Sequence, residues 1–295
     1  MAKKLLLIVN PRSGRAKMKA QLLPVCEIFS KAGFDVTVYP TKAQADATAR
    51  VLEIKQGEFD RIVVCGGDGT LNEVLTGLQK ANIDCPIGYI PCGTLNEWSS
   101  SLHISKDIKT AASDAAGDGL ITLDLGKFGE RYFSYTASFG AFTEASYSAP
   151  QDIKNVLGQA AYFFEGIKSL TNIKPIRLKF DCDDRTVEGD YLFGAVSNSM
   201  SVGGIVKFKE AAVELNDGMF EVLLIKMPKN IVDLNTIITS LSSNNFDNKY
   251  FDFFKASKLT VSPSEFLPWS LDGEYVHPKE DITVENLHGA VGFCK

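Results

Sequence analysis

The sequence is poor in the residues that build metal centres and cross-linked frameworks. It has only three histidines, too few for a histidine-rich metal site. Its six cysteines are scattered, and no two of them form a CxxC pair. This usage predicts free thiols in a reducing cytosol rather than disulfides or structural zinc. A basic surplus is absent as well, because the net charge is -5, and we therefore expect no nucleic-acid partner.

Long apolar runs are also missing. The apolar run near the N-terminus, Leu5–Val9, stops at a polar turn and is too short for a signal peptide. No stretch approaches the ~20 apolar residues that a membrane-spanning helix needs. We expect a cytoplasmic protein whose association with a membrane would be peripheral. The apolar content of 45% over 295 residues is ample for one large or two moderate domains.

Strand and helix patterns alternate up to about residue 120. The strands are expected at 5–9, 33–39, 61–65 and 86–90, and the helices at about 18–29, 43–55, 70–80 and 106–116. Thr70 and Glu73 fit a capping box, which predicts that the third helix starts there. Such alternation is typical of a parallel sheet covered by helices on both faces. Beyond Leu120, β-branched and aromatic segments predict antiparallel strands, interrupted by helices at 153–170 and about 230–242. We place the boundary near Asp124.

The segment 62–74, IVVCGGDGTLNEV, ends a predicted strand and opens a predicted helix. Its glycines would lie at the carboxyl edge of the sheet, where open α/β proteins bind ligands. Free N–H groups and the helix dipole attract phosphate there. Asp68 would repel phosphate unless a divalent cation, or water on that cation, lay between them. The alternative is a plain tight turn with Asp68 as a cap.

Two further turns follow predicted strands, in LLLIVNPRSG (5–14) and in YIPCGTLNEW (89–98). Three such turns from neighbouring parallel strands can converge on one triphosphate. The sequence has neither the GKS or GKT of a Walker A motif nor the GxGxxG dinucleotide fingerprint.

Four motifs in order resemble the diacylglycerol kinase catalytic-domain family in its soluble bacterial branch. They are NPRSG at 10–14, GGDGTLNEV at 66–74, PCGTLNEW at 91–98 and LDGE at 271–274. Sphingosine and ceramide kinases share this core, and NAD kinases are more distant relatives. The similarity extends over nearly the whole chain, including the segments 156–170 and 201–222.

The resemblance implies an N-terminal Rossmann-like parallel α/β domain at 1–124, which binds the nucleotide. It also implies an antiparallel β-sandwich domain with helical inserts at 125–285, which carries the acceptor site, and a tail at 286–295 that returns to the first domain. The implied activity is ATP- and Mg2+-dependent phosphorylation of a lipid hydroxyl, with diacylglycerol as the expected acceptor. The partners would be ATP and a lipid at the membrane surface, and we allow for a homodimer.

The resemblance also assigns residues. Nucleotide contacts are implied at Asn10, Pro11, Arg12, Ser13, Gly14, Thr41, Gly66, Gly67, Asp68, Gly69, Thr70, Asn72, Glu73, Thr94 and Asn96. Asp68, Glu97 and Asp124 would order the catalytic Mg2+ and its waters. Asp272 would be the base that takes the proton of the acceptor hydroxyl, with Glu274 beside it. Glu214, Asp217 and the carbonyl of Met219 match a second, structural Mg2+ site. At Asp272 and Asp217, each followed by glycine, a hairpin turn is the alternative reading.

The chain departs from the family pattern in three places. Glu97 replaces an aspartate, Ser99 and Ser100 stand where Ala-Arg is expected, and Asn216 is neutral where an acid is common. These differences leave open another acceptor, altered metal geometry or a weakened enzyme. An NAD kinase and a nucleotide- or lipid-binding homologue without catalysis are therefore the alternatives.

Two apolar segments could line a groove for acyl chains or simply pack on the β domain. One is the expected helix at 153–170, with Phe163 and Phe164 near its middle. The other is 244–255, NNFDNKYFDFFK, which is rich in aromatic residues.

Overall fold

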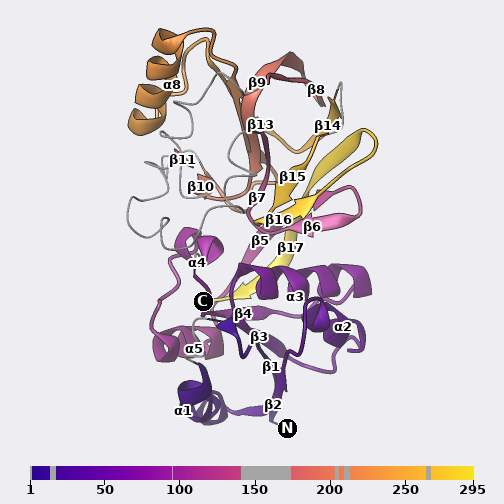
Figure 1. Cartoon of the computed structure of the whole chain (residues 1–295). Helices are drawn as coiled ribbons and strands as arrows, with labels where there is room; N and C mark the ends of the chain where they lie inside the picture. The colour runs from indigo at the N-terminus through magenta and orange to yellow at the C-terminus, as the bar shows by residue number, and fades with distance from the viewer. Residues whose placement is uncertain are drawn as a thin grey trace. The chain divides into compact units, whose positions relative to one another are not determined.

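The structure is a computed structural model that describes residues 2–13, 18–94, 96–140, 174–202, 206–208, 213–263 and 267–295. Contacts between residues divide the chain into two compact units (Figure 1). The first unit comprises Met1–Leu125 together with His288–Lys295, and the second comprises Gly126–Leu287. The second unit is therefore one continuous segment inserted into the first.

The first unit is built on a parallel sheet. Its strands are β1 (Lys3–Val9), β2 (Phe34–Pro40), β3 (Arg61–Gly66) and β4 (Ile87–Pro91). They lie in the order β2-β1-β3-β4, and the end of β17 (Ile282–Cys294) pairs with β4 in parallel. The helices are α1 (Met18–Lys31), α2 (Asp46–Leu52), α3 (Asp68–Ala81), α4 (Glu97–Ser101) and α5 (Ile108–Ala116). The predicted α/β architecture is confirmed.

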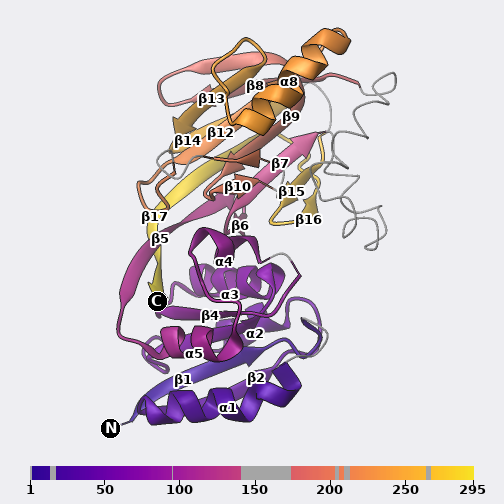
Figure 2. The ribbon, with the colours of Figure 1, turned by 90° about the vertical axis from the view of Figure 1, so that its left-hand side faces the viewer.

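Helices cover both faces of this sheet. The buried side chains of α1 and α5 share one core with those of β1 and β3. Figures 1 and 2 show α2 and α3 on the other side of the strands. From β1 the chain proceeds to β2, whereas from β3 it proceeds in the opposite direction to β4. The carboxyl ends of β1 and β3 thus form a topological switch point, the usual ligand-binding position in such sheets.

The expected start of α3 was wrong. The helix begins at Asp68, with Gly67 as its N-cap and no side-chain cap, so Thr70 and Glu73 do not form a capping box. Instead, Glu73 accepts hydrogen bonds from the N–H groups of Ala45 (2.8 Å) and Ala47 (3.1 Å) at the start of α2. The N-cap of α2 is Ala45, whose side chain has no acceptor. The carboxylate of Glu73 therefore satisfies donors that α2 cannot satisfy itself.

We expect Glu73→Ala to lower the free energy of unfolding by about 1–2 kcal/mol, because two N–H groups of α2 lose a charged acceptor. Urea unfolding followed by circular dichroism measures the change. Glu53→Ala is the control, since Glu53 is exposed and forms an ion pair with Arg50 at 3.6 Å, for which we expect a loss below about 0.5 kcal/mol. Equal losses for the two variants would contradict the capping role.

The second unit is mostly antiparallel sheet. Its strands include β7 (Thr136–Gly140), β8 (Ile176–Cys182), β9 (Thr186–Ser197), β14 (Lys258–Pro263), β15 (Trp269–Leu271) and β16 (Glu274–Val276). They follow the order β16-β15-β7-β9-β8-β14-β17, and β12 (Phe220–Lys226) pairs with both β9 and β13 (Phe251–Ala256). Two short strands, β10 (Ser201–Val202) and β11 (Val206–Lys207), form a separate pair. β5 (Leu120–Phe128) pairs with β6 (Arg131–Phe133) and, like β17, runs from one unit into the other.

Two hydrophobic cores occupy this unit. One contains the aromatic side chains Phe128, Phe133, Phe139, Phe180, Phe220 and Trp269. The other lies between the sheet and α8 (Ile231–Ser243), whose Leu234, Ile237 and Leu241 are buried in it. Side chains of β12 alternate between the two cores, as in a half of a β-sandwich. The predicted β-sandwich class is confirmed.

The helix expected at 230–242 is present as α8, capped by the side chain of Asn230. The helix expected at 153–170 lies outside the described residues. Within the residues that the structure describes, no helix is long and apolar enough to cross a membrane.

Candidate functional site

The turns after β1 and β3 are joined at the switch point. The backbone N–H of Asn10 donates to the carbonyl of Cys65 (2.8 Å), and its side-chain amide donates to Thr70 Oγ1 (3.0 Å). The N–H of Arg12 donates back to Asn10 Oδ1 at 3.0 Å. Asn10 and Thr70 therefore fix the two turns to each other. Pro11 and Ser13 are half-buried and Arg12 is exposed, whereas Gly14 falls outside the described residues.

The turns after β3 and β4 meet through two glycines. A Cβ atom on Gly67 would lie 3.2 Å from Gly93 Cα, and one on Gly93 would lie 2.6 Å from Gly67 Cα. A Cβ on Gly66 would meet the side chain of Thr70 at 2.7 Å. The N–H of Cys92 also donates to the carbonyl of Gly66 at 2.7 Å. The two backbones can approach this closely only because side chains are absent.

Asn96 closes the turn after β4. Its Oδ1 accepts hydrogen bonds from the N–H of Gly93 (2.9 Å) and the hydroxyl of Tyr89 (3.2 Å), and its Nδ2 donates to the carbonyl of Gly93 (2.9 Å). Its backbone has a positive φ of 51°, which asparagine tolerates better than most residues. Asn96 thereby leads into α4, a short helix that the sequence patterns did not predict. Thr94, on the same turn, is exposed.

Two of the three predicted acids of the catalytic set lie together. Asp68 Oδ2 accepts a hydrogen bond from the backbone N–H of Glu97 at 3.2 Å. Asp68 stands in the first turn of α3 and Glu97 in the first turn of α4, where carboxylates are favourable. Mg2+ prefers carboxylate oxygens and is commonly held by one or two of them together with substrate phosphates and waters. Among the described residues no group of three or more acidic, histidine or cysteine side chains gathers here, so a Mg2+ ion at this position would need phosphate oxygens and waters as its further ligands.

Asp124 is fully buried and is held by the C-terminal segment. Its Oδ1 accepts a hydrogen bond from the N–H of Gly289 (2.8 Å) and lies 3.0 Å from His288 Nδ1. The sequence reasoning missed His288, because no local pattern connects two residues so far apart in the chain. The return of residues 288–295 to the first unit is what brings them together.

Two of the residues that depart from the family pattern, Ser99 and Ser100, lie in α4. Ser99 is fully buried, and its hydroxyl donates to the carbonyl of Asn96 at 2.8 Å. Ser100, which stands where the family has arginine, is exposed. Ser99 therefore supports the turn after β4, and the missing arginine would have projected from the surface of α4.

The remaining predicted nucleotide contacts surround these turns. Thr41 follows β2, and its N–H donates to the carbonyl of Val9 at 2.8 Å. Gly69 is exposed in the first turn of α3, and Asn72 Oδ1 accepts a hydrogen bond from the hydroxyl of Thr76 at 3.3 Å. Glu73 is the least suited to a nucleotide contact, since both of its oxygens hold the start of α2.

Asp272 lies in a hairpin of the second unit. β15 and β16 pair with Leu271 opposite Glu274, so Asp272 and Gly273 form a two-residue turn, and both have positive φ. The hairpin reading is thus correct. The carboxylate nevertheless turns inward and is only 8% exposed, while Glu274 is exposed beside it.

Backbone N–H groups and a hydroxyl surround the Asp272 carboxylate. Oδ1 accepts the N–H groups of Tyr135 and Thr136, both at 3.0 Å. Oδ2 accepts the N–H of Ser134 at 2.5 Å and its hydroxyl at 2.8 Å. Burial raises the pKa of the Asp272 carboxyl, while these hydrogen bonds act in the opposite direction. Ser134 and its neighbours were not identified from the sequence, because nothing in their pattern marks an anion-binding turn.

The residues predicted for a second Mg2+ lie before β12. Glu214 is exposed, Met219 is half-buried, and Asp217 Oδ1 accepts the N–H of Met219 at 2.9 Å. Asp217 Oδ2 accepts a hydrogen bond from Lys255 Nζ at 2.6 Å. The same ammonium group lies 3.4 Å from Glu221 Oε1. Burial raises the pKa of the Glu221 carboxyl to about 7, an effect that Lys255 opposes.

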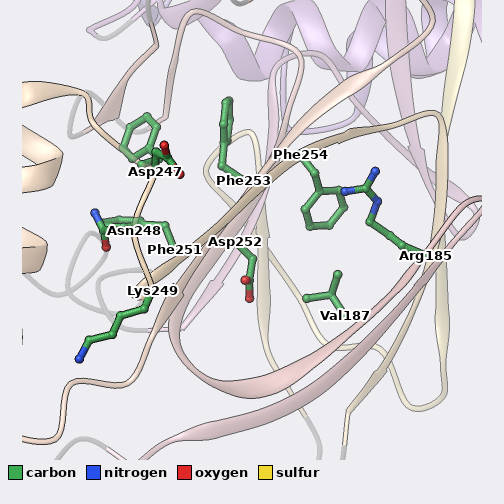
Figure 3. Close-up of a pocket in the computed structure, with 10 residues that line it drawn as sticks. Arg185, Val187, Asp247, Asn248, Lys249, Phe251, Asp252, Phe253 and Phe254 are labelled. Carbon is green, nitrogen blue, oxygen red and sulfur yellow. The ribbon is translucent and has the colours of Figure 1, made fainter.

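The aromatic rings of the segment 244–255 differ in burial. Phe251 and Phe254 are buried, whereas Phe253 is 38% exposed. Phe253 and Phe246 border a pocket of about 580 Å³, which also contacts Arg185, Lys249, Asp247 and Asp252 (Figure 3). The buried rings of Phe251 and Phe254 also line this pocket, so the same segment packs on the β domain and borders the pocket. Whether acyl chains bind there stays a prediction, and Phe163 and Phe164 lie outside the described residues.

Comparison with known families covers both units. The diacylglycerol kinase catalytic domain matches residues 4–128. The YegS C-terminal NAD kinase beta sandwich-like domain matches residues 137–291. The two matches together account for most of the chain, in the same order as the two units.

Individual proteins agree with the family matches. A diacylglycerol kinase of Bacillus subtilis (strain 168) is 32% identical over 270 residues, which cover 91% of this chain and 89% of the relative. A diacylglycerol kinase of Staphylococcus saprophyticus is 31% identical, covering 93% of this chain and 90% of the relative. A crystal structure from Bacillus anthracis str. Sterne, described as a candidate diacylglycerol kinase, superposes with a TM-score of 0.85 at 26% identity. It covers 99% of this chain and 95% of that one.

Proposed function

The chain belongs to the diacylglycerol kinase family and is a lipid kinase, and on this premise we propose that it transfers the γ-phosphate of ATP to the hydroxyl group of diacylglycerol. The reaction depends on Mg2+ and yields phosphatidate. The lipid would be met at a membrane surface. The observation that carries this proposal is the close contact between Gly67 and Gly93. It joins the turns after β3 and β4, which we assign to phosphate binding, beside Asp68 and Glu97.

The turns after β1, β3 and β4 would bind the triphosphate. The N–H groups at the start of a helix attract phosphate, and α3 begins directly after the carboxyl end of β3. Asp68 and Glu97, with Asp124, would hold Mg2+ and its waters. When bound, the metal ion would neutralise charge on the transferred phosphoryl group. Glu97 in place of aspartate keeps the charge and lengthens the side chain by one methylene.

Asp272 would take the proton of the acceptor hydroxyl. A carboxylate offers about four lone pairs, and donors of Ser134, Tyr135 and Thr136 are directed at the carboxylate of Asp272. Three of these donors are backbone N–H groups with fixed directions, but the hydroxyl of Ser134 can rotate about its Cβ–Oγ bond. Rotation of that hydroxyl would free one lone pair of Oδ2 for the substrate, while the backbone donors keep the carboxylate oriented. A pKa raised by burial suits a base at neutral pH.

The experiment is a transfer assay with purified protein, γ-labelled ATP, Mg2+ and vesicles that contain diacylglycerol. We expect labelled phosphatidate, and no label when EDTA replaces Mg2+. NAD serves as a parallel acceptor, because the match over 137–291 is to an NAD kinase-like domain. Labelled NADP with unlabelled lipid would overturn the proposal in favour of a nucleotide kinase. ATP binding without transfer to either acceptor would indicate a homologue that has lost catalysis.

A further inference from the structure

The turn before β12 is fastened to the sheet by one lysine. Glu221 on β12 lies opposite Lys255 on β13 in the antiparallel register. Both residues extend on the face that carries Leu223 and Ile225, the face of the core beneath α8. From there the Lys255 ammonium group reaches Asp217 Oδ2 at 2.6 Å and Glu221 Oε1 at 3.4 Å. Lys255 is therefore the shared counter-ion of two carboxylates.

Glu221 needs this counter-ion. Its side chain is fully buried, and neither carboxylate oxygen has a hydrogen-bond partner in the part of the chain that the structure describes. A buried carboxylate must be paired, coordinated to a metal or protonated. Within the same described ranges, Lys255 is the cation at ion-pair distance from Glu221.

The arrangement does not fit a divalent cation at Asp217. One oxygen of Asp217 accepts the N–H of its own turn, and the other accepts the ammonium group of Lys255. Mg2+ requires near-octahedral oxygen ligands at about 2.1 Å. A Mg2+ ion bound to Oδ2 would therefore lie close to the ammonium group that the same oxygen binds, and the two cations would repel each other.

We propose that the ammonium group of Lys255 takes the place of a divalent cation in this chain, neutralising Asp217 and Glu221 and holding the turn at Asp217 and Gly218 against β13. The second unit then needs no metal ion at this position. The inference concerns stability and does not depend on which acceptor the kinase uses.

The test compares thermal unfolding of the second unit with and without divalent cations. The chain has two tryptophans: Trp98 in the first unit and Trp269 in the second. A Trp98→Phe background leaves Trp269 as the sole fluorescence reporter. Melting is measured at about pH 8, in EDTA and in about 10 mM Mg2+ without nucleotide. We expect the two melting temperatures to agree within about 1 °C, because Lys255 already pairs with Asp217 and Glu221.

Lys255→Met in the same background removes the ammonium group and keeps most of the aliphatic stem. We expect the melting temperature in EDTA to fall by about 10 °C, because Glu221 and Asp217 lose their counter-ion. In Mg2+ at least about half of this loss should be recovered, since the two carboxylates become free to bind the ion. Adding Asp217→Asn to this variant should abolish the recovery.

Lys258→Met is the matched control. Lys258 also pairs across the sheet, with Glu285 at 3.8 Å, but both side chains are about half exposed. We expect a fall below about 2 °C and no response to Mg2+. A parent protein that itself gains several degrees in Mg2+, with the gain lost in Asp217→Asn, would overturn the proposal and place a metal ion at Asp217. The parent measurement decides even if Lys255→Met does not fold.

Discussion

Replacing Asp272 with asparagine is expected to lower kcat for lipid phosphorylation about 10³-fold while the Kd for ATP stays within about twofold. An amide cannot accept the proton of the attacking hydroxyl. Binding of ATP should be spared, because the turns that we assign to the triphosphate lie on β1, β3 and β4 in the first unit. Single-turnover assays measure the rate of transfer, and calorimetric titration measures the affinity.

The interpretation of Asp272→Asn needs a structural control, because the carboxylate also accepts three backbone N–H groups. Ser134→Ala removes the hydroxyl donor and leaves the carboxylate with its N–H partners. We expect this variant to fold normally and to keep kcat within about tenfold of the parent. If Asp272→Asn retains more than about a tenth of the turnover, Asp272 is not the base. If it loses ATP binding and melts early, its role is structural.

Gly93→Ala is expected to weaken ATP binding at least about tenfold. The new Cβ would lie 2.6 Å from Gly67 Cα and 2.7 Å from Asn96 Oδ1, closer than atoms can remain. The turns after β3 and β4 must then separate, and overpacking of this kind costs about 1–3 kcal/mol. A loss of about 1.4 kcal/mol of binding free energy already corresponds to a tenfold weaker Kd.

Gly292→Ala is the matched control for that substitution. Gly292 lies on β17 in the first unit, and a Cβ there would have its nearest contact at 3.5 Å, an ordinary van der Waals distance. We expect this variant to bind ATP as the parent does. Gly93→Ala with unchanged ATP affinity would show that the contact between the two turns is not part of a nucleotide site.

The architecture could be predicted where apolar periodicity is strong and local. The strands β1, β3 and β4 are short apolar runs, each followed by a glycine-containing or polar turn. The order of these strands in the sheet, with β2 beside β1 at the edge, did not follow from the sequence. The capping box predicted at Thr70 and Glu73 is not formed, although these residues match the pattern. The donors that Glu73 satisfies belong to α2, and a local motif carries no information about a neighbouring helix that lacks a cap.

The contacts that were missed all join residues distant in sequence. His288 meets Asp124 across 164 positions, and Ser134 meets Asp272 across 138. The sequence patterns predict no role for Lys255, because a lysine on an alternating strand normally has an exposed side chain. Only the pairing of β12 with β13 places it beside a buried glutamate. Patterns along the sequence do not show which distant strands pair with each other.

The chain leaves the first unit after Leu125 and re-enters it at His288. Asp124 Oδ1 accepts the N–H of Gly289 at 2.8 Å, so the exit and the return are adjacent. The second unit is thus a domain insertion between two adjacent positions of the first unit. The second unit could be exchanged for that of a relative by joining the chains at these two adjacent positions, without a new linker. If the second unit carries the acceptor site, as we propose for Asp272, such an exchange would change the acceptor preference and leave the first unit with its glycine turns unchanged.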